Sequence, residues 1–108
     1  MSRTYTYGAI RIQNGKYEDQ ILVLQKGEIL NIGRDTGSCN LVLEASWISK
    51  KHCSICYDER GKHYIVTDYS KNGTFLQGGL RLKYKQATDI KPGNVVRIAE
   101  QGIGLQLL

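Results

Sequence analysis

DYSKNGTFL, at residues 68–76, carries the strongest turn signal in the chain. Asn72 and Gly73 both tolerate positive φ, and an Asn-Gly pair between a polar run and the apolar pair Phe75-Leu76 is typical of a tight turn between strands. A backbone bent in this way aims successive N–H groups outward, where they can meet an anion or a peptide carbonyl. A lone Asn-Gly pair is most often a hairpin turn without function, so the rest of the chain must decide what this turn presents.

Around the turn, short apolar segments separated by glycine-containing turns predict an all-β fold. We expect strands at residues 5–12, 21–24, 28–32, 41–43, 52–57, 64–67, 80–85, 95–99 and 103–107. Within residues 80–85, apolar Leu80, Leu82 and Tyr84 alternate with basic residues, which predicts a strand with one basic face. No segment shows the apolar spacing of an amphipathic helix, so we expect almost no helix. About ten short strands fit a sandwich or barrel, whose loops at one end are free to build a site.

The chain length and composition indicate one globular domain. At 108 residues, with 41% apolar and 23% charged residues, the chain can bury a single core without disulfide staples. No apolar run approaches the roughly 20 residues that a membrane-spanning helix needs, and the first residues do not resemble a signal peptide. We therefore expect no membrane partner and a cytoplasmic location.

The three cysteines do not match a disulfide framework, so we expect reduced thiols. Cys53 and Cys56 form a C-x-x-C pair with His52, His63 and Cys39 nearby in sequence, so a zinc site has to be considered. The pair lies in a predicted strand, however, where positions three apart point to opposite faces and cannot share one ion. We therefore expect no bound metal and treat these cysteines as small apolar residues.

The positive charge is concentrated in the part of the chain that contains the turn. The net charge is +5, and residues 45–85 hold eight basic residues against three acidic ones, a difference that equals the whole excess. The basic residues are Lys50, Lys51, Arg60, Lys62, Lys71, Arg81, Lys83 and Lys85. This distribution indicates a negatively charged partner, such as nucleic acid, an acidic membrane surface or a phosphorylated protein, or else merely a soluble basic face.

Two further loops carry side chains that suit a phosphate group. Ile32-Gly33-Arg34 ends a predicted strand in an arginine, whose guanidinium fork can hold phosphate or carboxylate through two hydrogen bonds. Ser49-Lys50-Lys51-His52 places a hydroxyl, two ammonium groups and an imidazole at the start of another strand. Each segment alone fits an ordinary surface position. The two segments together with the Asn-Gly turn form a more specific pattern than any one of them alone.

Together these loops strongly resemble the forkhead-associated (FHA) domain family in the order and spacing of its motifs. The matching segments are Gly33-Arg34, Ser49-x-x-His52 and Asn72-Gly73-Thr74-Phe75, with Asp68-x-Ser70 before the turn and IKPGNVVRI at residues 90–98. The resemblance covers residues 28–98 of the chain. Two positions depart from the family pattern: Gln77-Gly78 stands where Asn-Gly is usual, and Gly93-Asn94 stands where Gly-Asp is usual. Neither departure removes a phosphate ligand, although the first can change how the turn is braced or how the ligand backbone is met.

The resemblance implies an eleven-stranded β-sandwich of two sheets, formed by residues 1–108 as a single domain, whose loops at one end bind phosphothreonine in a partner protein. It also implies a binding module rather than an enzyme, without a cofactor. The residues expected to bind phosphate are Arg34, Ser49, Lys50 and Lys71, and Asn72 is expected to bind the peptide backbone. Gly33, His52, Gly73 and Thr74 are expected to have structural roles, with His52 bracing the loops rather than touching the ligand.

The implied partner is a substrate of a serine/threonine kinase, or the kinase itself, and the domain is expected to be monomeric. Because FHA domains usually belong to longer chains, and this sequence begins and ends close to its outer strands, we expect a module excised from a longer protein.

Three alternatives compete with this interpretation. A basic all-β domain can be a nucleic-acid-binding barrel with aromatic residues stacked on bases, but we expect Tyr5, Tyr7, Tyr57, Tyr64 and Tyr84 to pack in or near the core. Ser49 and His52 suggest a nucleophile and its base, but no third group is identifiable. An FHA scaffold that binds partners without phosphate is opposed by the two lysines that follow Ser49.

Overall fold

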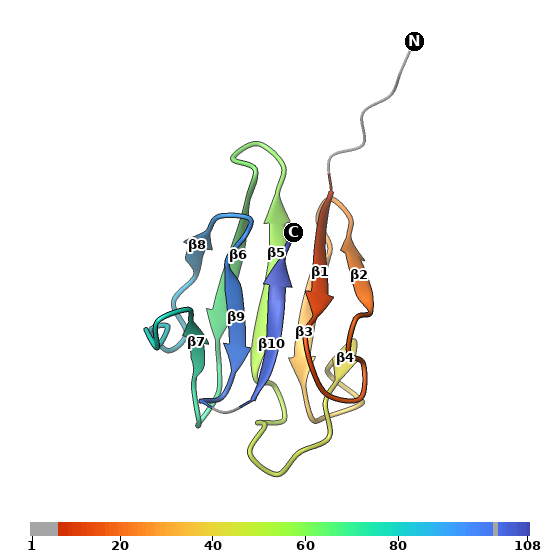
Figure 1. Cartoon of the computed structure of the whole chain (residues 1–108), viewed down its shortest axis with the longest axis vertical. Coiled ribbons are helices and arrows are strands. Elements are labelled where there is room, and N and C mark those ends of the chain that lie inside the picture. Colours follow the sequence, from red (N-terminus) through yellow and green to blue (C-terminus); the bar gives the residue numbers. More distant parts are fainter. Residues whose placement is uncertain (1–6, 101) are drawn as a thin grey trace.

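The computed structural model describes residues 7–100 and 102–108, and in this part of the chain ten strands form two five-stranded sheets (Figure 1). The first sheet has the order β2 (Ile21–Leu24), β1 (Gly8–Ile12), β10 (Ile103–Leu107), β9 (Val95–Ile98) and β7 (Thr74–Leu76). The second has the order β4 (Leu41–Val42), β3 (Ile29–Gly33), β5 (Cys53–Asp58), β6 (His63–Asp68) and β8 (Thr88–Ile90). Every pairing between these strands is antiparallel except that of β3 with β4.

Alternating side chains from both sheets build one hydrophobic core between them. Along β6, buried and half-buried residues alternate, so Tyr64 and Val66 point inward. Ile10 and Ile12 of β1 are buried in the same way from the opposite sheet, and each such side chain contributes about 1.5–3 kcal/mol by leaving water. The buried Tyr64 hydroxyl lies 2.8 Å from the Ala9 nitrogen, so its polar atom is satisfied.

The strand directions bring several loops to one end of the sandwich. Strand β3 ends at Gly33, β6 ends at Asp68, and the antiparallel β5 between them begins at Cys53. The loops at residues 34–40, 43–52 and 69–73 therefore lie together, joined by the turn between β9 and β10 (Figure 1, lower end). The β5–β6 turn and the C-terminal residue lie at the opposite end.

Most predicted strands are confirmed to within one residue at each end. The first is shorter than predicted because it begins at Gly8, and Tyr5 and Thr6 lie outside the described residues. Residues 7–100 and 102–108 contain no helix, as predicted, and none of their segments is a helix long and apolar enough to cross a membrane. Strands β7 and β8 were not predicted, because each has only three residues and forms through pairing with β9 or β6.

The predicted strand at residues 80–85 is wrong. This segment makes only isolated bridges, from Arg81 to Phe75 and from Tyr84 to Asp68. Leu82 is buried, but Leu80 and Tyr84 are 65% and 58% exposed, so the alternating apolar residues do not share a core face. Without this strand the described residues contain ten strands rather than the expected eleven, and the two-sheet sandwich is unchanged.

The cysteines and tyrosines follow the predictions in part. Cys53 is buried and Cys56 is half-buried on the opposite face of β5, which confirms the predicted strand and its alternation. Tyr64 is buried and packs edge-on against the half-buried Tyr57. Tyr7 is 52% exposed, and this exposure, like that of Tyr84, contradicts the expected packing role.

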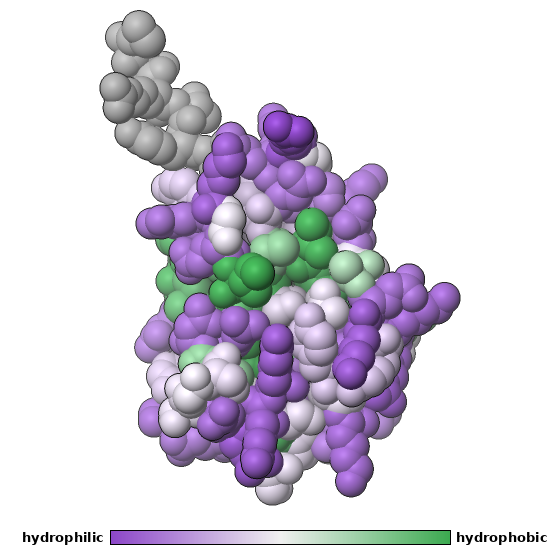
Figure 2. All heavy atoms as spheres, turned by 180° about the vertical axis from the view of Figure 1, so that it is seen from behind, coloured by the Kyte–Doolittle hydropathy of each residue, from purple (hydrophilic) through white to green (hydrophobic). Residues whose placement is uncertain are grey.

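An apolar band crosses the outer face of the second sheet. The register places Ile29 of β3 beside Cys56 of β5, and Cys56 beside Ile65 of β6. Figure 2 shows this band as a group of apolar side chains surrounded by polar ones. Ile29 is the first residue of β3 and Cys56 is near the end of β5, so the band lies away from the loops that carry the predicted motifs.

Candidate functional site

The loop after β3 and the loop before β5 are joined by main-chain hydrogen bonds. The Arg34 N–H donates to the Ser49 carbonyl over 3.0 Å, and the Asp35 N–H donates to the Lys50 carbonyl over 3.1 Å. The two backbones lie so close that a Cβ at Gly33 would overlap the Lys50 carbonyl. Glycine at position 33 therefore permits the approach that brings Arg34 next to Ser49.

The Arg34 side chain is exposed but anchored at one nitrogen. Its Nε donates to the Ile48 carbonyl over 3.0 Å. In the part of the chain that the structure describes, this is the one side-chain hydrogen bond of Arg34, so both terminal nitrogens remain available. A guanidinium held by Nε and free at its terminal nitrogens is arranged to bind two oxygens of one anion.

Ser49 connects this loop to the Asn-Gly turn. The Lys71 N–H donates to the Ser49 hydroxyl oxygen over 3.0 Å, so the hydroxyl can direct its own proton toward an added acceptor. Lys50, the next residue, and Lys71 are both exposed. The structure thus gathers the four predicted phosphate-binding residues, Arg34, Ser49, Lys50 and Lys71, from three loops at one end of the sandwich.

The Asn72 amide and the Gly73 backbone shape the turn itself. Asn72 Nδ2 donates to the Trp47 carbonyl over 2.8 Å, which leaves its Oδ1 as an acceptor at the surface. Gly73 has a φ of 97°, the left-handed region that favours glycine. Its carbonyl accepts the Ala99 N–H over 2.9 Å, which ties the turn to the end of β9.

A buried carboxylate organises the start of the turn. Asp68 Oδ1 accepts hydrogen bonds from the Ser70 N–H, the Ser70 hydroxyl and the Thr74 hydroxyl, at 3.0, 2.6 and 2.8 Å. The Ser70 oxygen in turn accepts the Gly73 N–H over 2.8 Å. Asp68, Ser70 and Thr74 are all buried, so this network is shielded from water and fixes the path of the chain into Asn72.

His52 lies below these loops, fully buried, and both of its ring nitrogens have partners. Nδ1 accepts the Ser49 N–H over 3.2 Å, and Nε2 lies 2.8 Å from the Gly73 carbonyl. Because Nδ1 is an acceptor, the ring proton is on Nε2, which donates to Gly73. The neutral imidazole thus links the Ser49 loop to the turn, and burial lowers its pKa despite the raising effects of the Gly73 carbonyl and Asp68.

We expect this lowered pKa to make the domain less stable in weak acid. Well above about pH 6.5 both the folded and the unfolded His52 are neutral. As the pH falls through the ordinary pKa, the unfolded histidine takes up a proton before the folded one, so the free energy of unfolding falls. Urea denaturation at about pH 7.5 and about pH 5.5 measures the loss. His52→Gln should reduce the loss, whereas His63→Gln, which changes the other histidine, should retain it. An equal loss in the wild type and His52→Gln would contradict this assignment.

Arg81 also lies at the turn, although it belongs to none of the predicted motifs. Its Nη2 donates to the Lys71 carbonyl over 3.2 Å, and its Nε lies 2.9 Å from the position of a Cβ added at Gly73. Arg81 therefore brings a second exposed guanidinium close to the turn. The sequence signal for this residue was its charge alone, because the predicted strand at residues 80–85 placed it on a sheet face.

The two departures from the family pattern occupy different surroundings. Gln77 is exposed and lines a hollow with Gln13, Asn14 and Arg97. Asn72 is not among the residues that line this hollow. Asn94 closes its own turn, because its Nδ2 donates to the Lys91 carbonyl over 2.9 Å. In this structure neither side chain makes a hydrogen bond to the residues that meet around Ser49.

The sequence of this chain is similar to those of known proteins. A family model described as FHA domain matches residues 30–99. The meiosis-specific serine/threonine-protein kinase MEK1 of Saccharomyces cerevisiae is 30% identical over an alignment of 96 residues, and the match covers 84% of this chain and 19% of the kinase. The chain therefore spans about a fifth of the length of this curated relative.

Solved FHA domains have the same fold. The crystal structure of the MEK1 FHA domain superposes with a TM-score of 0.80 at 26% identity, covering 94% of this chain and 88% of that chain. Its complex with a phosphothreonine peptide of HOP1 gives a TM-score of 0.77 at 27% identity, covering 94% of each chain. The N-terminal FHA domain of S. cerevisiae Rad53p, in complex with a phosphothreonine peptide, gives 0.78 at 19% identity over 95% of this chain and 93% of its own. The match of the family model over most of the chain, together with this fold, shows that the protein belongs to the FHA domain family.

Proposed function

We propose that this FHA domain binds phosphothreonine in a partner protein and so makes an interaction between proteins depend on phosphorylation. The observation that supports this proposal most directly is the meeting of Arg34, Ser49 and Lys71 at one end of the sandwich. Their donors come from three loops. The Arg34 N–H bonds to the Ser49 carbonyl, and the Lys71 N–H bonds to the Ser49 hydroxyl, so Ser49 joins the other two. Clusters of this kind, which contain arginine, are a recurrent means of recognising phosphorylated peptides.

In this proposal each side chain has a distinct role. The terminal nitrogens of Arg34 and the hydroxyl of Ser49 bind phosphate oxygens, and Lys50 and Lys71 add positive charge around them. Asn72 binds the peptide backbone through its amide, while its bond to the Trp47 carbonyl holds that amide in place. Gly33, His52, Gly73 and Thr74 maintain the loops.

The domain acts by binding alone in this proposal. Both ring nitrogens of His52 are used, one by the Ser49 N–H and one by the Gly73 carbonyl. The imidazole therefore does not accept the Ser49 hydroxyl proton, as a catalytic base would. We also propose that residues 1–108 are one monomeric module of a longer protein, whose partner is a serine/threonine kinase or a substrate of one.

An oriented peptide library with fixed phosphothreonine tests the proposed function and identifies a ligand. The selected peptide should bind with roughly micromolar affinity, about −8 kcal/mol. A library with unmodified threonine should show no enrichment. Equal enrichment from both libraries would refute a phosphate-dependent function.

We expect phosphothreonine to bind more tightly than phosphoserine in the same peptide. The extra methyl group of threonine restricts the side chain and adds apolar contact, so the gain should be about 1 kcal/mol, or roughly fivefold in affinity. Calorimetric titration of two peptides that differ only at this residue measures the difference. Indistinguishable affinities would show that the site does not contact the methyl group.

A further inference from the structure

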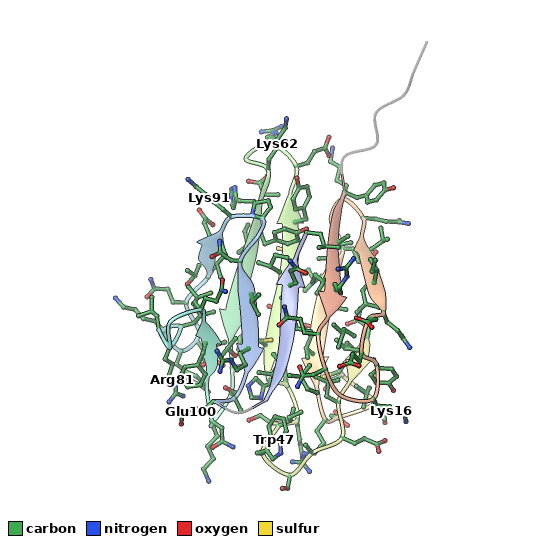
Figure 3. All side chains as sticks on the ribbon, viewed as in Figure 1. Lys16, Trp47, Lys62, Arg81, Lys91 and Glu100 are labelled. Carbon is green, nitrogen blue, oxygen red and sulfur yellow. The ribbon has the colours of Figure 1, made fainter. Side chains whose placement is uncertain are left out.

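A hollow of about 470 Å³ opens beside the Asn-Gly turn, and its lining combines an aromatic ring with a carboxylate. Trp47, Asn72, Ala99 and Glu100 line it. Asn72 also belongs to the proposed peptide site, so a peptide held by this amide would pass next to the hollow. Trp47 and Glu100 both lie at the loop end of the sandwich, opposite Lys62 (Figure 3).

The Trp47 side chain is held in position yet remains available for contact. Its main-chain carbonyl accepts the Asn72 amide, and its ring packs against Gly102, where an added Cβ would lie 2.7 Å from Cζ3. The residue is nevertheless 38% exposed, which is unusual for so large an apolar side chain. A fixed, partly exposed tryptophan offers contact area at little cost in conformational entropy.

Glu100 supplies negative charge at the rim of the same hollow. The Ala99 N–H bonded to the Gly73 carbonyl keeps this segment beside the turn. Arg97 donates to the main-chain carbonyl of Glu100 over 3.2 Å. Among the residues that the structure describes, ion pairs involve only His63 with Asp58 and Asp89, so none of them forms an ion pair with the Glu100 carboxylate.

We propose that this hollow binds a long basic side chain, arginine or lysine, of the phosphothreonine peptide. The inference rests on the proposed function and adds a second chemical requirement to it. A cation placed against the Trp47 ring gains cation–π attraction, and the Glu100 carboxylate accepts its N–H groups. In this proposal the site takes two opposite charges: Arg34 and Lys71 attract the phosphate, and the hollow that Asn72 also lines attracts a cation.

The test compares peptides that differ only by arginine, glutamine or glutamate at each position near the phosphothreonine. At one position, arginine should improve affinity for the wild type by about three- to tenfold. Glu100→Gln should remove most of this preference, and Glu100→Lys should reverse it toward a glutamate peptide. Glu59→Gln, in the β5–β6 turn at the far end of the sandwich, is the matched control and should leave the preference unchanged.

A second variant tests the contribution of the Trp47 ring. Trp47→Leu should reduce the arginine preference while binding still requires phosphate, and a thermal melt checks that the variant is folded. Phosphate-dependent binding that is indifferent to arginine at every position would overturn the inference and leave the proposed function standing. An arginine preference that survives in Glu100→Gln would also overturn it. If no phosphopeptide bound the wild type, the proposed function and this inference would fail together.

Discussion

Arg34→Ala should weaken phosphopeptide binding by at least about a hundredfold, because it removes two charge-assisted hydrogen bonds worth about 1.5–3 kcal/mol each. The fold should survive the change. The exposed guanidinium makes one hydrogen bond within the described protein, to the Ile48 carbonyl, so its loss should lower the free energy of unfolding by no more than about 1 kcal/mol. Calorimetric titration and a thermal melt of the same sample measure the two effects.

Arg34→Lys is the matched control for charge. Lysine retains the positive charge but cannot form a two-nitrogen fork, so its affinity should lie between those of the wild type and Arg34→Ala. Full recovery of affinity by lysine would show that charge alone is required. If Arg34→Ala unfolded the domain, its role would be structural and the assignment to the ligand would be wrong.

His52→Ala should have the opposite pattern, with a large loss of stability. The side chain is fully buried and links the Ser49 N–H to the Gly73 carbonyl, so its removal leaves a cavity and two unsatisfied groups. The expected cost is about 2–4 kcal/mol, which lowers the melting temperature of a domain of this size by roughly 10–25 °C. Binding should weaken only as the loops loosen.

His63→Ala is the matched control for removing a histidine. His63 is only partly buried, and its contacts with Asp58 and Asp89, at 3.6 and 3.4 Å, involve side chains that are partly exposed. Exposed pairs contribute little, so the melting temperature should change by only a few degrees. A His52→Ala protein that lost binding completely but kept the wild-type melting temperature would mean that His52 touches the ligand.

The sandwich was predictable from local patterns where side chains alternate between core and surface, as along β1 and β6. The motif turn was predictable because Asn72 and Gly73 suit a positive φ, which the structure shows at Gly73. At residues 80–85 the alternation of apolar and basic residues led to a wrong strand prediction, because an apolar side chain is buried only if a neighbouring segment covers it. Leu82 has such cover and Leu80 does not, and no local pattern distinguishes them.

Other parts of the site depend on contacts between distant segments. Trp47 and Glu100 are separated by more than fifty positions, yet they line one hollow because Asn72 bonds to the Trp47 carbonyl and Gly73 bonds to Ala99. The hydrogen bond between Lys71 and Ser49 likewise joins two loops that are far apart in sequence. Such pairs follow from strand order and register, which a single sequence leaves undetermined.

The most direct test of the account is a calorimetric titration of the wild-type domain with one library-selected peptide in two forms, with phosphothreonine and with unmodified threonine. The account predicts roughly micromolar binding of the phosphorylated form and no measurable binding of its twin. Because one phosphate in a preformed site neutralises few charges, the affinity should depend only weakly on salt concentration. Equal binding of the two forms, or tight binding of single-stranded nucleic acid with a steep salt dependence and none of the phosphopeptide, would contradict it.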